Sequence, residues 1–342
     1  MSLFTTRQLI AATQEKLKFR ALFLELFFPR EIVFDTEEVQ LDKITGRAPI
    51  ALYVSPTVEG KVQRNKGGMT RSLKPGYVKP KHQVTPTMVV ERLPGEDPTL
   101  LNNPAYRRER IIASNLQLEE QSIIQVEEMQ ATNAVLYGRY VMEGEQFAAV
   151  EVDFGRSPAN NITQGGPTAW SVQDAETFDP TFDLDLYADQ ASGTINMMVM
   201  DGLAWRTLNG FKRFREKLET RRGSNSQLET ALKDLGTLVS FKGYYGDVAV
   251  VVSKAQYVDE SGRAVRYLPD NTIVMGNSMA EGIRCYGMIQ DAEALAEGIS
   301  AARRYPKNWI TKGDVSSEYT MTQSAPLMVL PDPDAFVVIN LA

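Results

Sequence analysis

The sequence has 342 residues but only one histidine, His82, and one cysteine, Cys285. This pair alone cannot assemble a zinc site of the usual Cys/His kind. A serine triad built on His82 is not indicated either, because the sequence contains no GxSxG segment. A lone cysteine forms no internal disulfide, which is typical of a reducing compartment. We expect Cys285, within GIRCYGM, to be a small buried residue.

Other signals are also missing. No run of about 18 apolar residues is present, which argues against a membrane partner. The N-terminal stretch MSLFTTRQLIAATQEKLKF is polar where a signal peptide needs an apolar core, so we expect a cytosolic protein. Neither phosphate-binding pattern, GxxxxGK[ST] or GxGxxG, occurs after a strand. The sequence therefore predicts a protein that is not an enzyme, with no catalytic residues and no cofactor.

A cluster of aspartates is the one candidate metal site, formed by Asp179, Asp183, Asp185 and Asp189. It lacks the glycine and the terminal glutamate of a calcium loop. Asp179 before Pro180 is instead typical of a helix start, where early acids favour the positive end of the helix. The sequence therefore predicts a helix over 180–191 and no metal site.

Charge is unevenly distributed along the chain, whose formal net charge is −6. Gly60–Val90 contains no acid but seven basic residues: Lys61, Arg64, Lys66, Arg71, Lys74, Lys79 and Lys81. Ser157–Trp205 is the reverse, with seven acids and no Lys or Arg. Three interpretations of the basic segment 60–90 remain open: nucleic-acid binding, a solvated loop, or contact with an acidic surface on another copy. The complementary segments favour self-assembly.

The clearest element is a long helix over 103–137. Asn103 is a fair N-cap, Pro104 suits the first turn, and Gly138 is a fair stop. An apolar stripe is formed by Ile112, Leu116, Ile123 and Met129. Charged residues are expected on its solvent-exposed faces: Arg107, Arg108, Glu119, Glu120, Glu127 and Glu128.

An arm and a projecting hairpin precede this helix. In the arm, residues 5–16 suit a short helix, and apolar residues including Phe23 and Phe27 then repeat at helical spacing up to Pro29. Extended chain follows in IVFDTEEVQLDKI. The hairpin pairs IALYVSPTVEG with YVKPKHQVTPTMVVERL, and its prolines exclude it from the centre of a sheet. Such a hairpin is marginally stable alone, so we expect arm and hairpin to dock on a partner.

After the long helix, strands and helices alternate, which indicates an α/β or α+β domain. We expect a strand TINMMVM, a helix over 202–220, and a helix over 226–239 that opens with the capping box Ser226-x-x-Glu229. Strands YGDVAVVVSKAQYV and VRYLPDNTIVMGN follow. The final segment SEYTMTQSAPLMVLPDPDAFVVIN predicts two strands around Pro331–Asp334, which return to the long helix.

The order of these elements resembles the major capsid proteins of tailed phages, which have the Hong-Kong-97-like fold. The sequence itself resembles the lambda-like head proteins most, in segments that span nearly the whole chain: ALYVSP, PGYVKPKH, RLPGEDP, NPAYRRERII, RRGSNSQLETALKDLG, YGDVAVVV, ARRYPKNW and QSAPLMVL. A prophage copy would look the same. The resemblance implies an α+β chain with an N-terminal arm (1–48), an extended loop (49–95), a peripheral domain (96–160 and 301–342) and an inserted axial domain (161–300).

The resemblance also implies a function. Family members assemble as hexamers and pentamers into an icosahedral procapsid that expands as the genome enters. The implied partners are further copies, scaffold, portal and decoration proteins, and packaged DNA. The expected inter-subunit residues are the seven basic residues above, Phe23 and Phe27 of the arm, and Asp179, Asp183 and Asp185. For DNA contact the candidates are Arg213, Arg215, Lys217, Arg221 and Arg222, with a solvated helix face as the alternative. A non-enzymatic nucleic-acid-binding protein that uses segment 60–90 is the alternative function.

Overall fold

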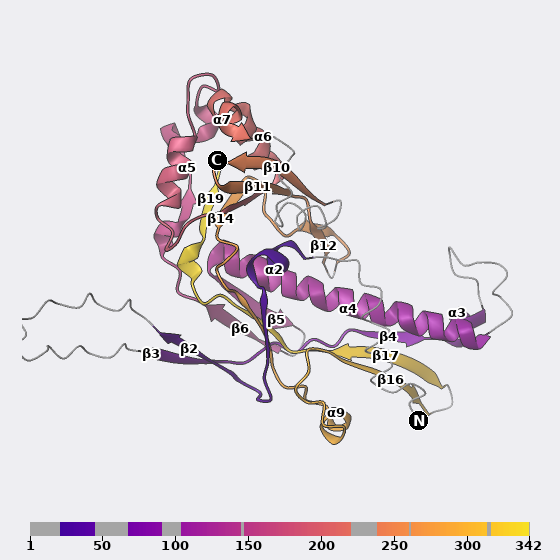
Figure 1. Ribbon diagram of the computed structural model, residues 1–342. Helices are drawn as coiled ribbons and strands as arrows, with labels where there is room; N and C mark the ends of the chain where they lie inside the picture. Colours follow the sequence, from indigo (N-terminus) through magenta and orange to yellow (C-terminus); the bar gives the residue numbers. More distant parts are fainter. Residues whose placement is uncertain are drawn as a thin grey trace, which may run out of the picture.

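The computed structural model describes residues 21–44, 68–90, 104–144, 147–219, 238–259, 261–312 and 316–341. Figure 1 shows a long helix, α4, crossing the molecule, with a large sheet and three helices above one end and smaller sheets alongside. The expected helix over 226–239 is wrong at its end, because Val239 begins a strand over Val239–Tyr245. The expected helix over 5–16 and residues 226–237 lie outside the described residues. So do Lys61, Arg64, Lys66, Arg221 and Arg222.

Helix α4 spans Pro104–Tyr137, which is 34 residues and agrees with the predicted bounds. It ends at Gly138, whose φ of +68° is easily adopted only by glycine. The Gly138 amide donates to the Ala134 carbonyl at 3.0 Å, which satisfies one of the last carbonyls of the helix.

A seven-stranded mixed sheet forms the centre of the region that the sequence resemblance assigned to the axial domain. Its strands in spatial order are β7 (Asn161–Thr163), β19 (Val337–Asn340), β14 (Thr272–Gly276), β8 (Met197–Met200), β11 (Val248–Ser253), β10 (Val239–Tyr245) and β9 (Leu218–Glu219). The β8–β11 and β19–β7 pairs are parallel, and the other pairs are antiparallel. This mixture agrees with the expected α+β class.

Alternate residues of the central strands face two different cores. In β8, Met197 and Val199 pack into the cluster that contains α4, whereas Met198 and Met200 pack beneath three helices. These helices are α5 (Thr181–Ala188), α6 (Gly202–Gly210) and α7 (Lys212–Lys217). Because both faces are covered, β8 is apolar at every position, which explains the run MMVM.

Two of the expected domain limits differ from the structure. Strand β19 was expected to return to the long helix but lies between β7 and β14 in the large sheet. Conversely, β15 (Ile283–Tyr286) falls within the expected axial range 161–300, yet it pairs with β18 (Pro326–Val329) beside α4. Strand β1 (Arg30–Val33) extends this small sheet by pairing in parallel with β15. Apolar strands of this length give no sequence signal for which sheet they join.

The hairpin strands are also paired differently from the prediction. Strand β3 (Gly68–Leu73) pairs with β2 (Val39–Ile44), a segment that the sequence assigned to the arm. The return stretch instead forms β4 (Lys81–Val84), which pairs with β17 (Ser317–Gln323). Strand β4 lies at the edge of the sheet β16–β17–β4, as its flanking prolines require. It is followed by a short helix, α3 (Pro86–Val90), rather than by further strand.

The remaining elements are short. They are the hairpin strands β5 (Arg139–Gly144) and β6 (Phe147–Asp153), the hairpin strands β12 (Gln256–Val258) and β13 (Ala264–Arg266), the strand β16 (Tyr305–Thr311), the helix α9 (Ala292–Ala296), and four 3-10 turns over Pro158–Asn160, Gly166–Thr168, Trp170–Val172 and Pro333–Ala335. The last of these turns lies at the predicted turn before β19.

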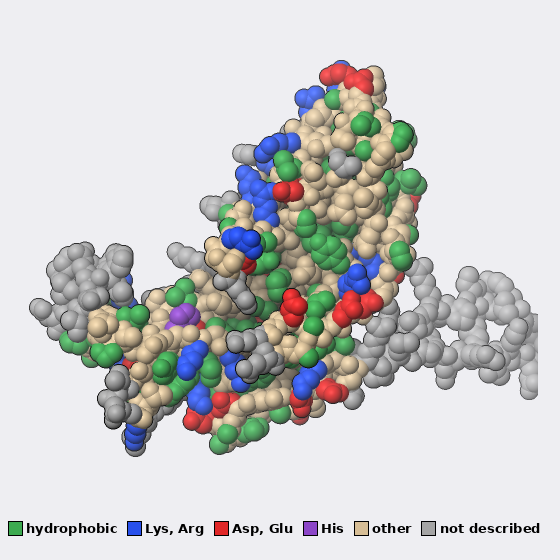
Figure 2. Space-filling model, turned by 180° about the vertical axis from the view of Figure 1, so that it is seen from behind, with side chains coloured by type: hydrophobic (Ala, Val, Ile, Leu, Met, Phe, Trp, Pro, Cys, Tyr) green, Lys and Arg blue, Asp and Glu red, His purple; other side chains and the backbone are tan. Residues whose placement is uncertain are grey.

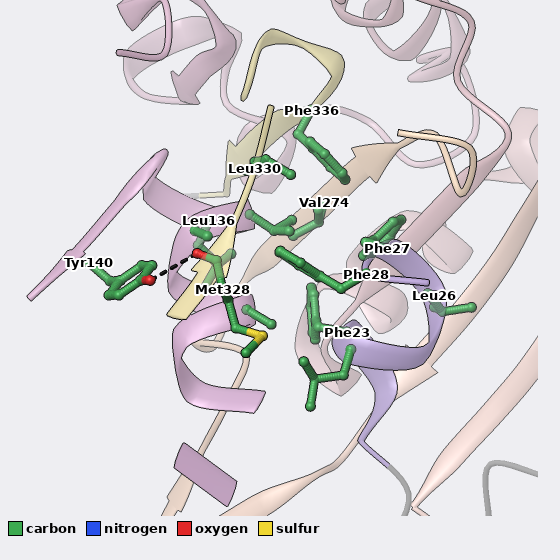
Figure 3. Close-up of a cluster of buried hydrophobic side chains, with 14 of the residues drawn as sticks. Phe23, Leu26, Phe27, Phe28, Leu136, Tyr140, Val274, Met328, Leu330 and Phe336 are labelled. Atoms are coloured by element: carbon green, nitrogen blue, oxygen red, sulfur yellow. Dashed lines mark hydrogen bonds between the residues drawn. The ribbon is translucent and has the colours of Figure 1, made fainter. Parts of the chain in front are cut away.

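The arm forms helix α2 (Leu22–Phe27), which packs into the core of its own chain (Figure 3). The Phe27 ring meets the Phe336 ring edge-on at a centroid distance of 5.0 Å. Phe23 and Phe27 are only 1% and 0% exposed, so neither has free surface for contact with another copy. Their assignment to an inter-subunit contact is therefore wrong: the partner of this part of the arm is the chain itself.

We expect Gly138→Ala to destabilise the chain by about 1–3 kcal/mol, because the new side chain would occupy a positive-φ position. Its Cβ would also lie 2.5 Å from the Cβ of Arg156. Gly210→Ala is the matched control, since Gly210 has no positive φ and an added Cβ meets open space. Urea unfolding followed by circular dichroism measures both. Equal stabilities for the two variants would contradict this account of the helix end.

Candidate functional site

Helix α4 carries four buried glutamates, Glu119, Glu120, Glu127 and Glu128, none of which is more than 4% exposed. The prediction that these residues mark solvent-exposed faces is wrong. Arg107, also expected on an exposed face, is 4% exposed. The carboxylates are covered by the arm, by β4 and β17, and by residues 303–304, all distant in sequence from most of the helix. They therefore fix the positions of the segments that project from the core.

Glu128 holds the start of the arm helix. Its two carboxylate oxygens accept hydrogen bonds from the amides of Phe23, at 2.8 Å, and Leu24, at 3.0 Å. Ala21, at the N-cap position of α2, has no side chain that could cap the helix, so Glu128 supplies the missing acceptor. Burial raises the pKa of Glu128 to about 7, although the two amides oppose this rise.

The other end of α2 is held by Arg284 on β15. Its guanidinium donates to the carbonyls of Phe28, at 2.7 Å, and Leu24, at 2.9 Å. The Gly282 amide donates to the Phe27 carbonyl at 2.9 Å. A positive charge at a helix C-terminus is favourable, so both ends of this six-residue helix are bound by complementary groups.

Glu120 and Glu127 surround Arg304. The Arg304 Nε atom lies 2.8 Å from Glu120 Oε2, and a terminal nitrogen lies 2.8 Å from Glu127 Oε1. The second contact is an ion pair without the alignment of a hydrogen bond. Burial alone would lower the pKa of Arg304, but Glu127 and Glu120 outweigh burial and raise it. The guanidinium also lies 5.5 Å from the centre of the Tyr286 ring.

Glu119 connects α4 to the return strand of the extended loop. Its oxygens accept from the hydroxyls of Thr320, at 2.7 Å, and Thr322, at 2.8 Å, on β17. The Nδ1 atom of His82 on β4 lies 3.3 Å from Glu119 Oε1. Burial raises the pKa of Glu119, and these hydrogen bonds oppose the rise. The single histidine thus joins a loop strand to the long helix.

Three of the predicted basic contact residues have partners within the chain. Lys74 forms an ion pair with Glu37, which raises the pKa of the lysine and lowers that of the glutamate. The Lys79 ammonium lies 4.5 Å from the centre of the Tyr77 ring. Lys81 similarly covers two aromatic rings, of Tyr319 and Trp309. Of Arg71 only the backbone, in β3, is described.

The predicted aspartates support the axial helices instead of a metal. Asp179 accepts from the Thr181 amide at 3.1 Å and from Lys217 at 2.9 Å, and Asp183 accepts from the Trp170 indole at 2.8 Å. Partial burial would raise the pKa of Asp179, but these hydrogen bonds outweigh it and lower the pKa. Asp185 accepts from the Tyr245 hydroxyl at 3.1 Å. Within the described ranges no group of His, Cys, Asp or Glu is arranged to hold a metal ion.

Helix α5 begins at Thr181, one residue after the expected Pro180, and it ends at Ala188. Its outer side carries an apolar surface that the sequence reasoning missed. Phe182 is 76% exposed and Leu186 60% exposed, and Val172 nearby in sequence is 66% exposed. Phe182 and Leu186 are four residues apart and therefore lie on one side of the helix. We call Val172, Phe182 and Leu186 the α5 face. Exposed apolar side chains grouped in this way are typical of a protein interface.

The lone cysteine is buried, as expected, with 0% exposure on β15. Burial raises the pKa of its thiol to about 12, which leaves it protonated and unreactive at neutral pH. None of the described helices combines the length and the hydropathy needed to cross a membrane.

A family model described as phage major capsid protein E matches residues 5–340. The chain belongs to this family. It is 67% identical to the major capsid protein of Enterobacteria phage P21 over 341 residues, and 58% identical to that of Escherichia phage lambda over 342 residues. Both alignments cover all of each chain. The family membership makes the chain a structural protein of a phage head, as the sequence resemblance implied.

A solved structure supports the same assignment. The putative capsid protein of a prophage from Escherichia coli CFT073 superimposes with a TM-score of 0.85 at 40% identity, over the full length of both chains. The relatives include a P21 prophage-derived major head protein from the same strain, also 67% identical. The expected α+β capsid fold is confirmed.

We expect stability to fall as pH rises through the pKa of Glu128. Because the folded-state pKa lies above the usual 4.5, the neutral carboxyl is favoured in the folded chain. Its contribution to stability is complete below pH 4.5 and is lost as pH approaches 7, a change of about 3 kcal/mol. Glu128→Gln keeps an acceptor but does not titrate. Urea unfolding at pH 5 and pH 8 should therefore show less pH dependence in the variant, and identical profiles would contradict the assignment.

Arg304→Gln should destabilise the chain by about 3–5 kcal/mol, because it leaves Glu120 and Glu127 buried without their cation. Arg303→Gln is the matched control. The Arg303 side chain is 34% exposed against 11% for Arg304, and its distance from Glu127 is longer, at 3.8 Å. We expect the control to lose less than half as much stability in the same unfolding experiment. A larger decrease in Arg303→Gln would show that the buried cation has been misassigned.

Proposed function

We propose that this head protein assembles as hexamers and pentamers into an icosahedral shell that encloses double-stranded DNA. The observation that carries this proposal is the match to the capsid protein family over residues 5–340. Assembly takes place in the cytoplasm of the bacterial host. Scaffold, portal and decoration proteins are the expected partners besides further copies.

The two-stranded β2–β3 ribbon supports the proposal. A two-stranded ribbon without a third strand is marginally stable in water, so it gains stability from contact with a neighbour. At its base the two strands are joined by the Lys74–Glu37 ion pair and by Ser72, which donates a hydrogen bond to Glu38. Val39 and Leu73, also at this base, pack on the core of the chain, so the ribbon is anchored at this end.

The α5 face is the second assembly surface of the proposal. It is apolar and is flanked by Asp183 and Asp185, which suits contact with the basic segment 60–90 or with the axial domain of a neighbour; Asp179 is bound by Lys217, whose ammonium lies 5.9 Å from the centre of the Phe182 ring. In a ring of identical copies each contact joins two different surfaces, so an acidic surface opposite a basic one fixes the direction of the ring. Individually weak contacts become strong when they are repeated around a closed ring.

The alternative function, a nucleic-acid-binding protein that uses segment 60–90, has no comparable support. The relatives named above are capsid and head proteins, and none is a nucleic-acid-binding regulator. Shell assembly is therefore the single function that we propose.

Electron microscopy of the protein, expressed with and without a scaffold partner, tests this function directly. Rings or closed shells are expected at high protein concentration. Featureless monomers under both conditions would reject self-assembly as the function of this chain.

We expect the double variant Phe182→Ser, Leu186→Ser to fold normally but to form no shells, because both side chains are largely exposed in the single chain. Charge reversal of Lys74, Lys79 and Lys81 to glutamate should also block assembly. Arg139→Glu, on the exposed hairpin β5–β6, is the matched control and should assemble. Thermal unfolding verifies the fold of each variant. Normal shells from the first variant would exclude the α5 face as an interface.

A further inference from the structure

A basic pocket lies on the axial domain, away from the α5 face. Its volume is about 270 Å³. It is found where two parallel strands, β8 and β11, reach their carboxyl ends, next to the start of α6. In open sheets with parallel strands this edge is the usual position of a ligand-binding crevice. The lining residues are Gly202, Leu203, Arg206, Ser253, Lys254, Gln256, Arg266 and Asp270.

Three cations and one acid line the pocket, which leaves it with an excess of positive charge. Arg266 forms an ion pair with Asp270. Among the described residues, Arg206 and Lys254 have no carboxylate within ion-pair distance. The backbone amides of Leu203 and Ala204, at the start of α6, already donate hydrogen bonds to the Asp201 side chain. The attraction for an anion therefore comes from the three cationic side chains and not from the helix terminus.

The positive charge continues beyond the pocket. Figure 2 shows Lys and Arg side chains in a row along one edge of the axial domain, over the elements α7, α6 and β12. Helix α7 itself carries Arg213 and Arg215, of which Arg213 lies 3.9 Å from Glu216. A single small anion needs only the pocket, whereas a row of cations suits a ligand with regularly spaced negative charges.

The composition of this edge favours nucleic acid over protein. Protein interfaces need a buried apolar centre, whereas binding to a phosphate backbone needs mainly positive charge. None of the lining residues is an exposed large apolar side chain, and Leu203 is half-buried. The exposed apolar residues Phe182 and Leu186 lie on α5, on a different part of the domain (Figure 1).

We propose that Arg206, Lys254 and Arg266 bind successive phosphate groups along the backbone of double-stranded nucleic acid, one phosphate for each cation. This inference deepens the proposed function, because it assigns the contact between the shell and its genome to a defined site. It replaces the basic segment 60–90 as the nucleic-acid contact. Of the DNA candidates taken from the sequence, Arg213 lies 3.9 Å from Glu216 and Lys217 is bound to Asp179, so only Arg215 is left to extend the site.

The test measures the affinity of unassembled full-length protein for a fluorescent 30-base-pair duplex, by anisotropy at several salt concentrations. The triple variant Arg206→Gln, Lys254→Gln, Arg266→Gln should bind about tenfold more weakly at 0.1 M salt for each cation that is removed. Its log–log salt slope should be smaller by about 3.

Gly202→Glu supplies an independent test without the removal of any cation. An added side chain at Gly202 meets open space, and an acid in the first turn of a helix is favourable, so the fold should be retained. The new carboxylate would enter the pocket and compete with phosphate. We expect weaker duplex binding, with Gly202→Ala close to the wild type.

The control for charge alone removes three exposed cations from the peripheral domain, as Arg110→Gln, Arg139→Gln, Lys312→Gln. If this control binds the duplex as weakly as the pocket variant, net charge and not the pocket explains the binding, and the proposal is overturned. Unchanged binding in Gly202→Glu would also overturn it.

Competition distinguishes the possible sources of the anion. If inorganic phosphate binds the protein but the duplex does not, the site is a pocket for small anions only. Polyglutamate that displaces the duplex at equal charge concentration would assign the site to an acidic protein segment. Either result overturns the nucleic-acid assignment. Shell formation, scored by microscopy for the same variants, is expected to persist, so failure of this inference is distinguishable from failure of the proposed function.

Discussion

The structure depends on the buried carboxylates of helix α4. Four glutamates along one helix must each find a cation or a hydrogen-bond donor, because an unpaired buried charge costs several kcal/mol. Their partners lie on separate segments: those of Glu119 on β4 and β17, the shared partner of Glu120 and Glu127 at Arg304, and those of Glu128 on α2. Replacement of such pairs by apolar residues is often neutral for stability, so their value lies elsewhere. An apolar side chain tolerates small shifts, whereas a carboxylate with two specific donors does not. We infer that the glutamates fix the angles at which arm and loop leave the core.

This fixation suits the proposed shell subunit, in which each projecting segment would have to reach a surface on another copy. In the arm, the start of α2 is bound by Glu128 and its end is bound by Arg284. The loop returns through β4, whose His82 is bound to Glu119. Both anchors therefore lie on one rigid helix of 34 residues. A movement of α4 relative to the large sheet would move both segments together, which makes the helix a suitable element for a coordinated change in shell geometry.

The sequence predicted the elements better than their partners. The bounds of α4 followed from Pro104 and Gly138, which are local signals. The α+β class and the capsid family followed from segments spread over the whole chain. Strand pairing did not, because β19 and β15 have the same apolar character and only tertiary contacts decide which sheet each one joins. The buried glutamates were also misplaced. Two adjacent glutamates on a helix normally indicate a solvent-exposed face. The hydrogen-bond donors that allow these glutamates to be buried, such as Arg304 and Thr320, lie about 200 residues away in the sequence. The same limit applies to Phe23 and Phe27: their spacing predicted an apolar helix face, but not that this chain covers it.

In the two proposals, contact with other copies and binding to nucleic acid use different surfaces of the axial domain. The sequence had suggested the basic segment 60–90 for both. The basic residues of 60–90 drew attention because they are adjacent in sequence, yet Lys74 is paired with Glu37, and Lys79 and Lys81 lie over aromatic rings of their own chain. Arg206, Lys254 and Arg266 are spread over 60 positions and give no sequence signal, but the ends of β8, β11 and β13 bring them to one pocket. The α5 face, by contrast, is apolar and flanked by acids, so it repels a phosphate backbone and favours protein. A shell subunit that binds neighbouring copies and also contacts nucleic acid needs two separate surfaces. If one surface served both, nucleic acid would compete with assembly.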